Sequence, residues 1–285
     1  MFVIIGAVVV TVCVIGGFMM AGGNVVLLIQ PAEFVVIGGA AIGSILISSP
    51  PALIKKLLAS VPEAISPNHF TKKDFLDLLK SFNDLFLIAQ RDGLLAIEPH
   101  VENPEESEIL SKNKKFMANT VAINFFSDTM KVMLSGGVPP HELEGLIDNE
   151  IETYEKELHP IAASMAKVGD ALPGLGIVAA VLGIIVTMAS INDGAEAVGR
   201  HVAAALVGTF LGILLAYGFV NPLAQNLEHI AEDKVQFMNT IKSCIIGYAK
   251  GNPPIIAVEL ARRTIFSDER PTFSELEAHI RNKDK

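Results

Sequence analysis

Hydrophobic and polar residues are separated into long blocks along this chain. Residues 1–54 contain a single charged residue, Glu33, and residues 171–227 contain only three. The segment between these blocks and the C-terminal tail carry almost all the other charges. A single soluble globule would distribute its charges more evenly, so the pattern predicts two membrane-embedded blocks and two polar ones.

Each apolar block divides into two helices that are long enough to cross a bilayer, which takes about 20 apolar residues. Residues 1–21 and 34–54 flank a Gly-Gly-Asn turn, and residues 171–192 and 201–227 flank a short charged segment. A cleaved signal peptide is the alternative for the first helix, but no basic residue precedes its apolar stretch. The sequence therefore predicts four transmembrane helices in two hairpins.

The polar blocks show helical periodicity. One predicted helix has an apolar face whose members recur every three or four residues: Phe75, Leu78, Leu79, Phe82, Leu85 and Phe86. A second helix is predicted over 104–135, and a third begins near His141 and continues into the third span. In the C-terminal tail, a long helix is predicted over 222–248 and a short helix over 272–280.

The predicted fold class is thus an all-α membrane protein with a helical cytoplasmic domain between spans two and three and a helical C-terminal tail. The expected division is a transmembrane hairpin at 1–54, the cytoplasmic domain at 55–170, a second transmembrane hairpin at 171–227 and a cytoplasmic tail at 228–285.

Basic residues set the predicted orientation. Of the 22 lysines and arginines, only Arg200 lies at a hairpin tip, whereas Lys55, Lys56 and Lys167 lie directly beside spans two and three. By the positive-inside rule, both termini and the large loop are cytoplasmic. The expected location is the plasma membrane, with lipid around the spans.

Composition and motifs exclude several function classes. The block 55–170 has 12 basic and 19 acidic residues, which disfavours nucleic acid as a partner. Two cysteines cannot form a disulfide scaffold. No phosphate-binding loop, metalloprotease motif or nucleophile elbow occurs, so we expect neither an enzyme nor a bound metal or cofactor.

The apolar helices carry small residues at the spacing that lets membrane helices pack closely. These faces contain Gly39 and Gly43 on span two, Gly176 on span three, and Gly208 and Gly212 on span four. Packing within one chain and oligomerisation both account for this pattern. No acidic or basic residue lies in the middle of a span, so ion transport would need an acid from a partner.

Two prolines, Pro173 and Pro222, lie near the cytoplasmic ends of spans three and four. Each removes a helical hydrogen bond, so together they are candidate hinges that connect an event in the membrane to the polar block. A simple helix boundary is the alternative interpretation of each proline.

The stretches GDALPGLGIVAAVLGIIVTMAS and VGTFLGILLAYGFVNPLA closely resemble the MotA family of flagellar motor stator subunits, as do QPAEFVVIGGAAIGS and PPIIAVELARRTIFSDERPTFSELEAHI. The resemblance implies a complex of five such chains around two MotB, whose membrane aspartate supplies the missing acid. It also implies that ion flow rotates the ring against the rotor protein FliG, with Pro173 and Pro222 as coupling hinges.

The resemblance also suggests individual residues. Glu98 matches a rotor-facing acidic position directly, and Glu150 lies in a matching acidic segment. Arg91 stands next to Gln90, which occupies the usual arginine position. Sodium-driven relatives carry hydroxyls on both helices that line the ion path, whereas this chain has Ala180 and Thr209 there. A proton is therefore the expected ion.

Two alternatives to the stator function remain at this point. The TolQ and ExbB group uses a similar proton-driven ring to energise the outer membrane, although its members typically have three spans. A membrane scaffold without ion flux would also lack an acid in its spans.

Overall fold

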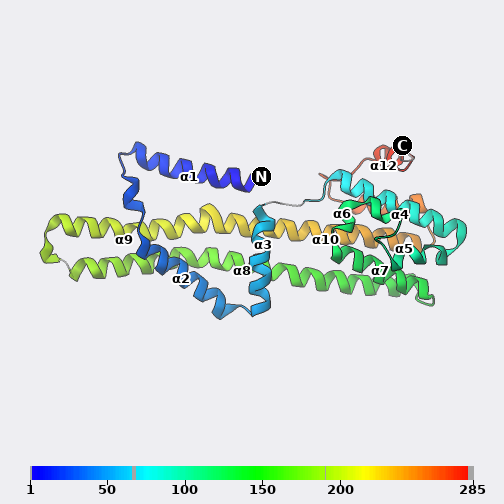
Figure 1. Cartoon of the computed structure of the whole chain (residues 1–285), viewed down its shortest axis with the longest axis horizontal. Coiled ribbons are helices and arrows are strands. Elements are labelled where there is room, and N and C mark those ends of the chain that lie inside the picture. Colours follow the sequence, from blue (N-terminus) through cyan, green and yellow to red (C-terminus); the bar gives the residue numbers. More distant parts are fainter. Residues whose placement is uncertain (1, 66–68, 190, 282–285) are drawn as a thin grey trace. The chain divides into compact units, whose positions relative to one another are not determined.

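The computed structural model describes residues 2–65, 69–189 and 191–281, which form twelve α-helices and no strand (Figure 1). The helices are α1 Phe2–Met20, α2 Pro31–Ser48, α3 Pro51–Ile65, α4 Lys72–Asp92, α5 Glu98–Glu102, α6 Lys114–Met117, α7 Thr120–Ser135, α8 Pro140–Ala189, α9 Ala195–Leu215, α10 Asn221–Ala249, α11 Pro254–Thr264 and α12 Phe273–Arg281.

The chain forms two compact units. The membrane unit comprises Met1–Asn68 and Glu157–Ile230, and the polar unit comprises His69–Lys156 and Ala231–Lys285. Helices α8 and α10 each contribute residues to both units. The four candidate spans lie in α1, in α2 with the turn before it, in α8, and in the run of helix from α9 into α10. The prediction of four spans is confirmed.

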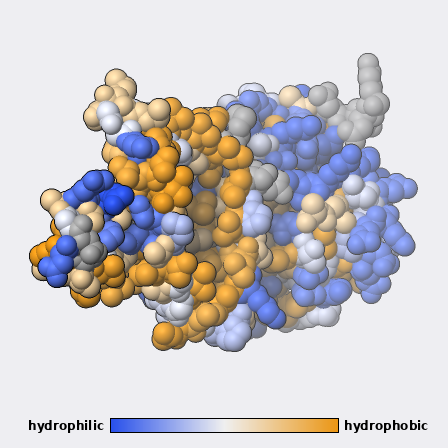
Figure 2. Space-filling view, turned by 60° about the vertical axis from the view of Figure 1, so that its left-hand side comes forward, coloured by the Kyte–Doolittle hydropathy of each residue, from blue (hydrophilic) through white to orange (hydrophobic). Residues whose placement is uncertain are grey.

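Apolar side chains dominate the surface of the spans. Helix α1 has no buried residue, and large hydrophobic side chains such as Phe2, Val35 and Ile185 are more than half exposed. Figure 2 shows hydrophobic residues gathered into one continuous region of the visible surface. An exposed apolar surface of this extent is stable against lipid and not against water.

The second span ends earlier than the sequence predicts. Helix α2 stops at Ser48, and a separate amphipathic helix, α3, begins at Pro51. Pro50 and Pro51 cause this break, because proline cannot donate the hydrogen bond that would continue a helix. The predicted span over 34–54 is therefore too long at its C-terminal end.

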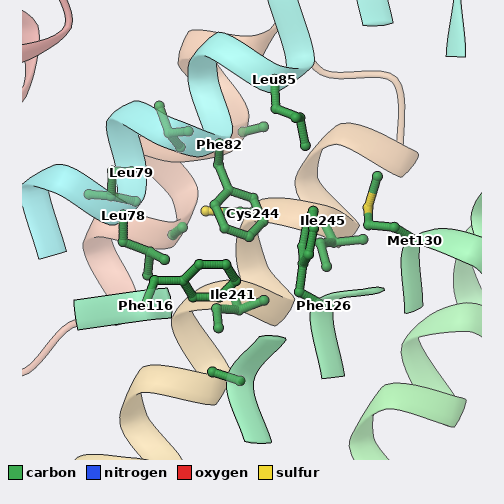
Figure 3. Close-up of a cluster of buried hydrophobic side chains, with 14 of the residues drawn as sticks. Leu78, Leu79, Phe82, Leu85, Phe116, Phe126, Met130, Ile241, Cys244 and Ile245 are labelled. Atoms are coloured by element: carbon green, nitrogen blue, oxygen red, sulfur yellow. The ribbon is translucent and has the colours of Figure 1, made fainter. Parts of the chain in front are cut away.

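The polar unit is built around aromatic and aliphatic side chains from α4, α7, α10 and α11 (Figure 3). All six residues of the predicted α4 face are buried. Phe82 contacts Phe126 edge to face at 5.3 Å between ring centroids, and Phe86 stacks on Tyr248 at 4.4 Å. The periodicity of α4 and its burial confirm that prediction.

The predicted helix over 104–135 is wrong in its continuity. Only α7 is a full helix within it, and the preceding residues form turns and the short helix α6. Asn113 and Asn119 each accept a hydrogen bond in their side chains from a backbone N–H three residues later. Such caps start new helices, so two asparagines divide the segment. The long helices predicted from His141 and over 222–248 are confirmed as α8 and α10.

Candidate functional site

The apolar part of α8 packs against α9 through glycines. A Cβ placed on Gly176 would lie 2.7 Å from the carbonyl oxygen of Gly208 and 3.1 Å from the Cα of Gly212. Seven residues, or about two turns, further along α8, a Cβ on Gly183 would lie 2.7 Å from the Cβ of Ala205. The structure therefore brings three of the five predicted packing glycines together at one helix crossing.

The other two predicted packing glycines, Gly39 and Gly43, lie on a different face of α2. A Cβ at either position would meet no atom within 4 Å. The buried face of α2 consists of Glu33, Ile37 and Ala41, which are spaced four residues apart. Gly39 and Gly43 thus make no close packing contact within the described part of this chain.

The predicted ion-path residues lie beside the glycine crossing. Ala180 is buried and follows Gly176 by four residues, which places both on one side of α8. Thr209 is half-buried, and its Cα lies 3.3 Å from the position of a Gly176 Cβ. Ala180 and Thr209 therefore both lie within about one helical turn of the Gly176 crossing, one on each helix.

The two predicted hinge prolines lie inside continuous helix. Pro173 is within α8, and Pro222 is the second residue of α10. A π-helical turn, Ala216–Val220, joins α9 to α10 without a loop. Insertion of an extra residue into a helical turn is frequent at functional sites, so α9 and α10 have a local irregularity directly before Pro222.

A polar contact that the sequence analysis missed connects α8 and α10 beside these prolines. Asn221 donates a hydrogen bond from Nδ2 to Oδ1 of Asp170 at 3.2 Å. The Oδ1 atom of Asn221 has no hydrogen-bond partner in the described structure and fills the space beside Gly169 where a Cβ would project. The signal in the sequence was a polar residue three positions before Pro173 and another just before Pro222.

The three predicted rotor-facing residues all belong to the polar unit. The side chain of Arg91 is 76% exposed, and it forms an ion pair with its neighbour Asp92 at 2.6 Å. This hydrogen-bonded pair lowers the pKa of Asp92 and raises that of Arg91. Glu98 is exposed at the first position of α5, and Glu150 is exposed on the polar first part of α8.

No hydrogen bond or ion pair joins Arg91, Glu98 and Glu150 to one another among the described residues. Partial desolvation, and then the negative charge of Asp128, raise the pKa of Glu150. The structure therefore presents three separate charged positions, and the charge of Arg91 is partly balanced by Asp92.

Glu33 is the residue whose position the sequence analysis did not anticipate. It stands in the first turn of α2, and only 8% of its surface is exposed. Its Oε2 atom has no hydrogen-bond partner in the described structure. Glu33 lies at the start of a span and not in its middle, so it does not contradict the prediction about the span centres; what the sequence did not indicate is that this carboxylate is buried.

The sequence of this chain matches two family models, which together cover most of its length. The model for the Motility protein A N-terminal region matches residues 4–93, and the model for the MotA/TolQ/ExbB proton channel family matches residues 117–240. Motility protein A of Salmonella typhimurium is 41% identical over 240 residues, covering 84% of this chain and 81% of the relative. The chain belongs to the MotA/TolQ/ExbB proton channel family. Motility protein A of Escherichia coli K12 is similar to the same extent.

Two solved structures share the fold of this family member. A chain of the C. jejuni MotAB structure gives a TM-score of 0.78 at 23% identity, covering 95% of this chain and 98% of that one. A chain of the flagellar MotAB stator complex from Bacillus subtilis gives 0.69 at 22% identity, covering 90% and 92%. The family is one of proton channels rather than enzymes, and this member is an inner-membrane protein with four spans.

Proposed function

We propose that this chain is a stator subunit of the bacterial flagellar motor, which forms a proton channel with a MotB protein and converts ion flow into torque on the rotor. The observation that carries the proposal is the 41% identity to Motility protein A over most of both chains. The match of residues 4–93 to the Motility protein A model favours this function over a TolQ-like or ExbB-like one.

In this proposal the membrane unit forms the ion path and the polar unit contacts the rotor. The membrane unit provides close helix packing at Gly176, Gly208 and Gly212 and a path lined by Ala180 and Thr209. A MotB helix supplies the aspartate at the centre of the path, in an assembly of five copies of this chain around two of MotB. The polar unit presents Glu98, Glu150 and Arg91 to the rotor protein FliG.

The prolines transmit the movement in this proposal. Protonation and deprotonation of the MotB carboxylate change the packing beside α8 and α9, and Pro173 and Pro222 allow both helices to bend at the same level. The π-helical turn before Pro222 and the Asp170–Asn221 hydrogen bond support this location for the bend. The division into hairpins at 1–54 and 171–227, a domain at 55–170 and a tail at 228–285 is part of the same proposal.

A motility experiment tests the ion and the function together. The chain and its matching MotB are expressed in a strain that lacks its own stator, and swimming speed is measured while external sodium varies at a fixed proton-motive force. Restored swimming that does not depend on sodium is the expected result. Speed that rises with sodium would refute the proton as the transported ion, which was expected because Ala180 lacks a hydroxyl. If both proteins reach the membrane and no swimming returns, the stator function is refuted.

A further inference from the structure

The membrane unit buries one carboxylate for which the proposed ion path has no role yet. Glu33 lies at the junction of three helices, because its Oε2 atom occupies the place where a Cβ of Gly208 on α9 would project. The Cβ of Ala179 on α8 lies 3.1 Å from that same place. Only glycine at position 208 leaves room for the carboxylate, and the next residue is Thr209, which the proposed path includes.

Glu33 lies well inside the apolar part of the unit. Gly208 is seven residues beyond His201 along α9, a distance of about 10 Å at the rise of an α-helix. No charged residue occurs on α9 between these two positions. By the predicted orientation, the start of α9 faces the outside, so the carboxylate belongs to the outer half of the span.

Among the residues that the structure describes, no charged side chain forms an ion pair with Glu33. The titratable groups on the helices around it lie elsewhere: Glu196, Arg200 and His201 near the start of α9, Asp170 nine residues before Ala179 on α8, and Lys55, Lys56 and Glu63 on α3. Helix α2 carries no other titratable group. A buried acid without a partner is costly in a membrane, and such residues most often mark an ion pathway.

We infer that Glu33 is a proton-carrying residue of the channel, located between the outer surface and the MotB carboxylate. Its carboxylate takes a proton from a hydronium ion that enters from outside, which releases water. The carboxylic acid then gives the proton to a water molecule beside Thr209, which regenerates the carboxylate and a hydronium ion that moves inward. This inference rests on the proposed function, because it needs a proton acceptor further along the path.

The test measures the rotation of a bead on a flagellar motor at low load, with the chain and its matching MotB in a strain without its own stator. Glu33→Gln keeps the size of the side chain and one acceptor oxygen, but its NH2 group cannot take up and release a proton as a carboxylate does. We expect this variant to co-purify with MotB at the unsubstituted level and to rotate on the order of tenfold more slowly. Glu33→Asp, which remains an acid, should recover part of the speed.

Glu196→Gln is the matched control, because Glu196 is an exposed acid at the start of α9. It removes the same charge from the same side of the membrane and should rotate at the unsubstituted speed. Measurements at external pH 6, 7 and 8 separate the two variants: only Glu33→Gln should change how speed depends on external pH.

Three results distinguish the possible failures. Unsubstituted speed for Glu33→Gln at every external pH would overturn the inference and leave the stator function intact. Loss of MotB from the Glu33→Gln complex would assign Glu33 a purely structural role and also overturn it. Absence of rotation with the unsubstituted chain would refute the proposed function, and the inference with it.

Discussion

Gly169 and Asn221 fit together as backbone and side chain: the carboxamide oxygen of Asn221 fills the space in which a Cβ on residue 169 would lie. The carboxamide nitrogen of Asn221 meanwhile bonds Asp170, the residue that follows Gly169. One side chain of α10 therefore contacts two consecutive residues of α8 within the membrane unit, close to both Pro173 and Pro222.

The contact between Gly169 and Asn221 predicts that adding a methyl group at position 169 lowers stability. In Gly169→Ala, the new Cβ overlaps the oxygen of Asn221, so the side chain must move and its hydrogen bond to Asp170 is lost. We expect a loss of about 1–3 kcal/mol of stability, which is typical of overpacking. The thermal midpoint of the purified complex in detergent measures it.

Two further variants make the prediction at Gly169 specific. Gly145→Ala, in the same helix but with open space around its Cβ, should be neutral or slightly stabilising. The double variant Gly169→Ala with Asn221→Ala should lose less than the sum of the two single changes, because the overlap is gone. Additive losses would show that the two residues do not interact.

Pro173→Ala tests the proposed hinge. Alanine restores a helical hydrogen bond and stiffens α8, so the complex should assemble with MotB but fail to turn the rotor. Co-purification and swimming in soft agar measure the two properties. Pro160→Ala, at the other proline inside α8, serves as the control and should swim. Normal swimming by Pro173→Ala would remove the hinge function from this residue.

Charge reversal at Glu98 tests the proposed contact with the rotor. Glu98→Lys should lower swimming speed without abolishing it, because one exposed ion pair contributes only about 0–1 kcal/mol. A reversed charge on FliG should restore part of the loss. Glu102→Lys makes the same change on the same short helix and should have a smaller effect. Unchanged swimming by Glu98→Lys would exclude this residue from the interface.

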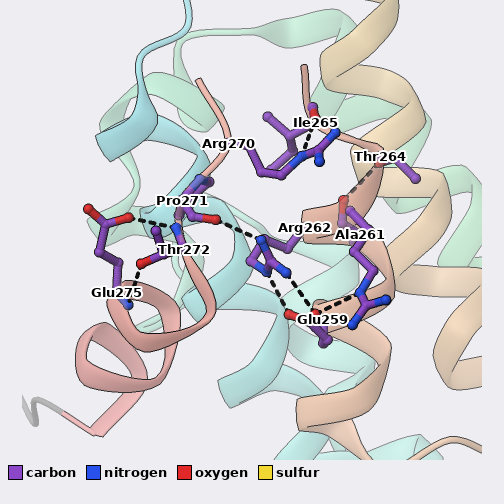
Figure 4. Close-up of polar contacts among 10 residues, drawn as sticks. Glu259, Ala261, Arg262, Thr264, Ile265, Arg270, Pro271, Thr272 and Glu275 are labelled. Atoms are coloured by element: carbon purple, nitrogen blue, oxygen red, sulfur yellow. Dashed lines mark hydrogen bonds and ion pairs between the residues drawn. The ribbon is translucent and has the colours of Figure 1, made fainter. Parts of the chain in front are cut away.

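Glu259 predicts a pH dependence of stability in the polar unit. Its carboxylate accepts hydrogen bonds from Arg262 at 2.6 and 2.8 Å and from Arg263 at 2.8 Å (Figure 4). The bond from Arg262 is the main reason that the pKa of Glu259 is lowered. The stabilisation is therefore complete above the unfolded pKa of glutamate, about 4.3, and disappears as the pH falls through the lower folded value.

Glu259→Gln should remove that dependence. Because both Glu259 and Arg262 are nearly buried, the loss of the charge at neutral pH should cost about 3 kcal/mol. Acid unfolding followed by circular dichroism compares the variant with the unsubstituted protein. Glu105→Gln, at an exposed position, should keep the original profile. Parallel acid profiles for all three proteins would contradict the role of this ion pair.

The sequence predicts those features that depend on local periodicity or on long apolar runs. The face of α4 from Phe75 to Phe86 and the four spans are of this kind. The break at Asn113 and Asn119 was missed because a capping asparagine resembles an ordinary polar helix residue until its side chain is placed. Glu33 was missed for a different reason: its burial depends on Gly208, which lies 175 positions further along the chain.

The passages between the two units have a mechanical consequence. The chain crosses between the units three times: once directly before His69, once inside α8 between Lys156 and Glu157, and once inside α10 between Ile230 and Ala231. The two crossings inside α8 and α10 are unbroken helical backbone and contain no glycine-rich tether. A helix is stiffer along its axis than a flexible linker, so a shift or a twist of α8 or α10 at its crossing passes along the helical backbone itself.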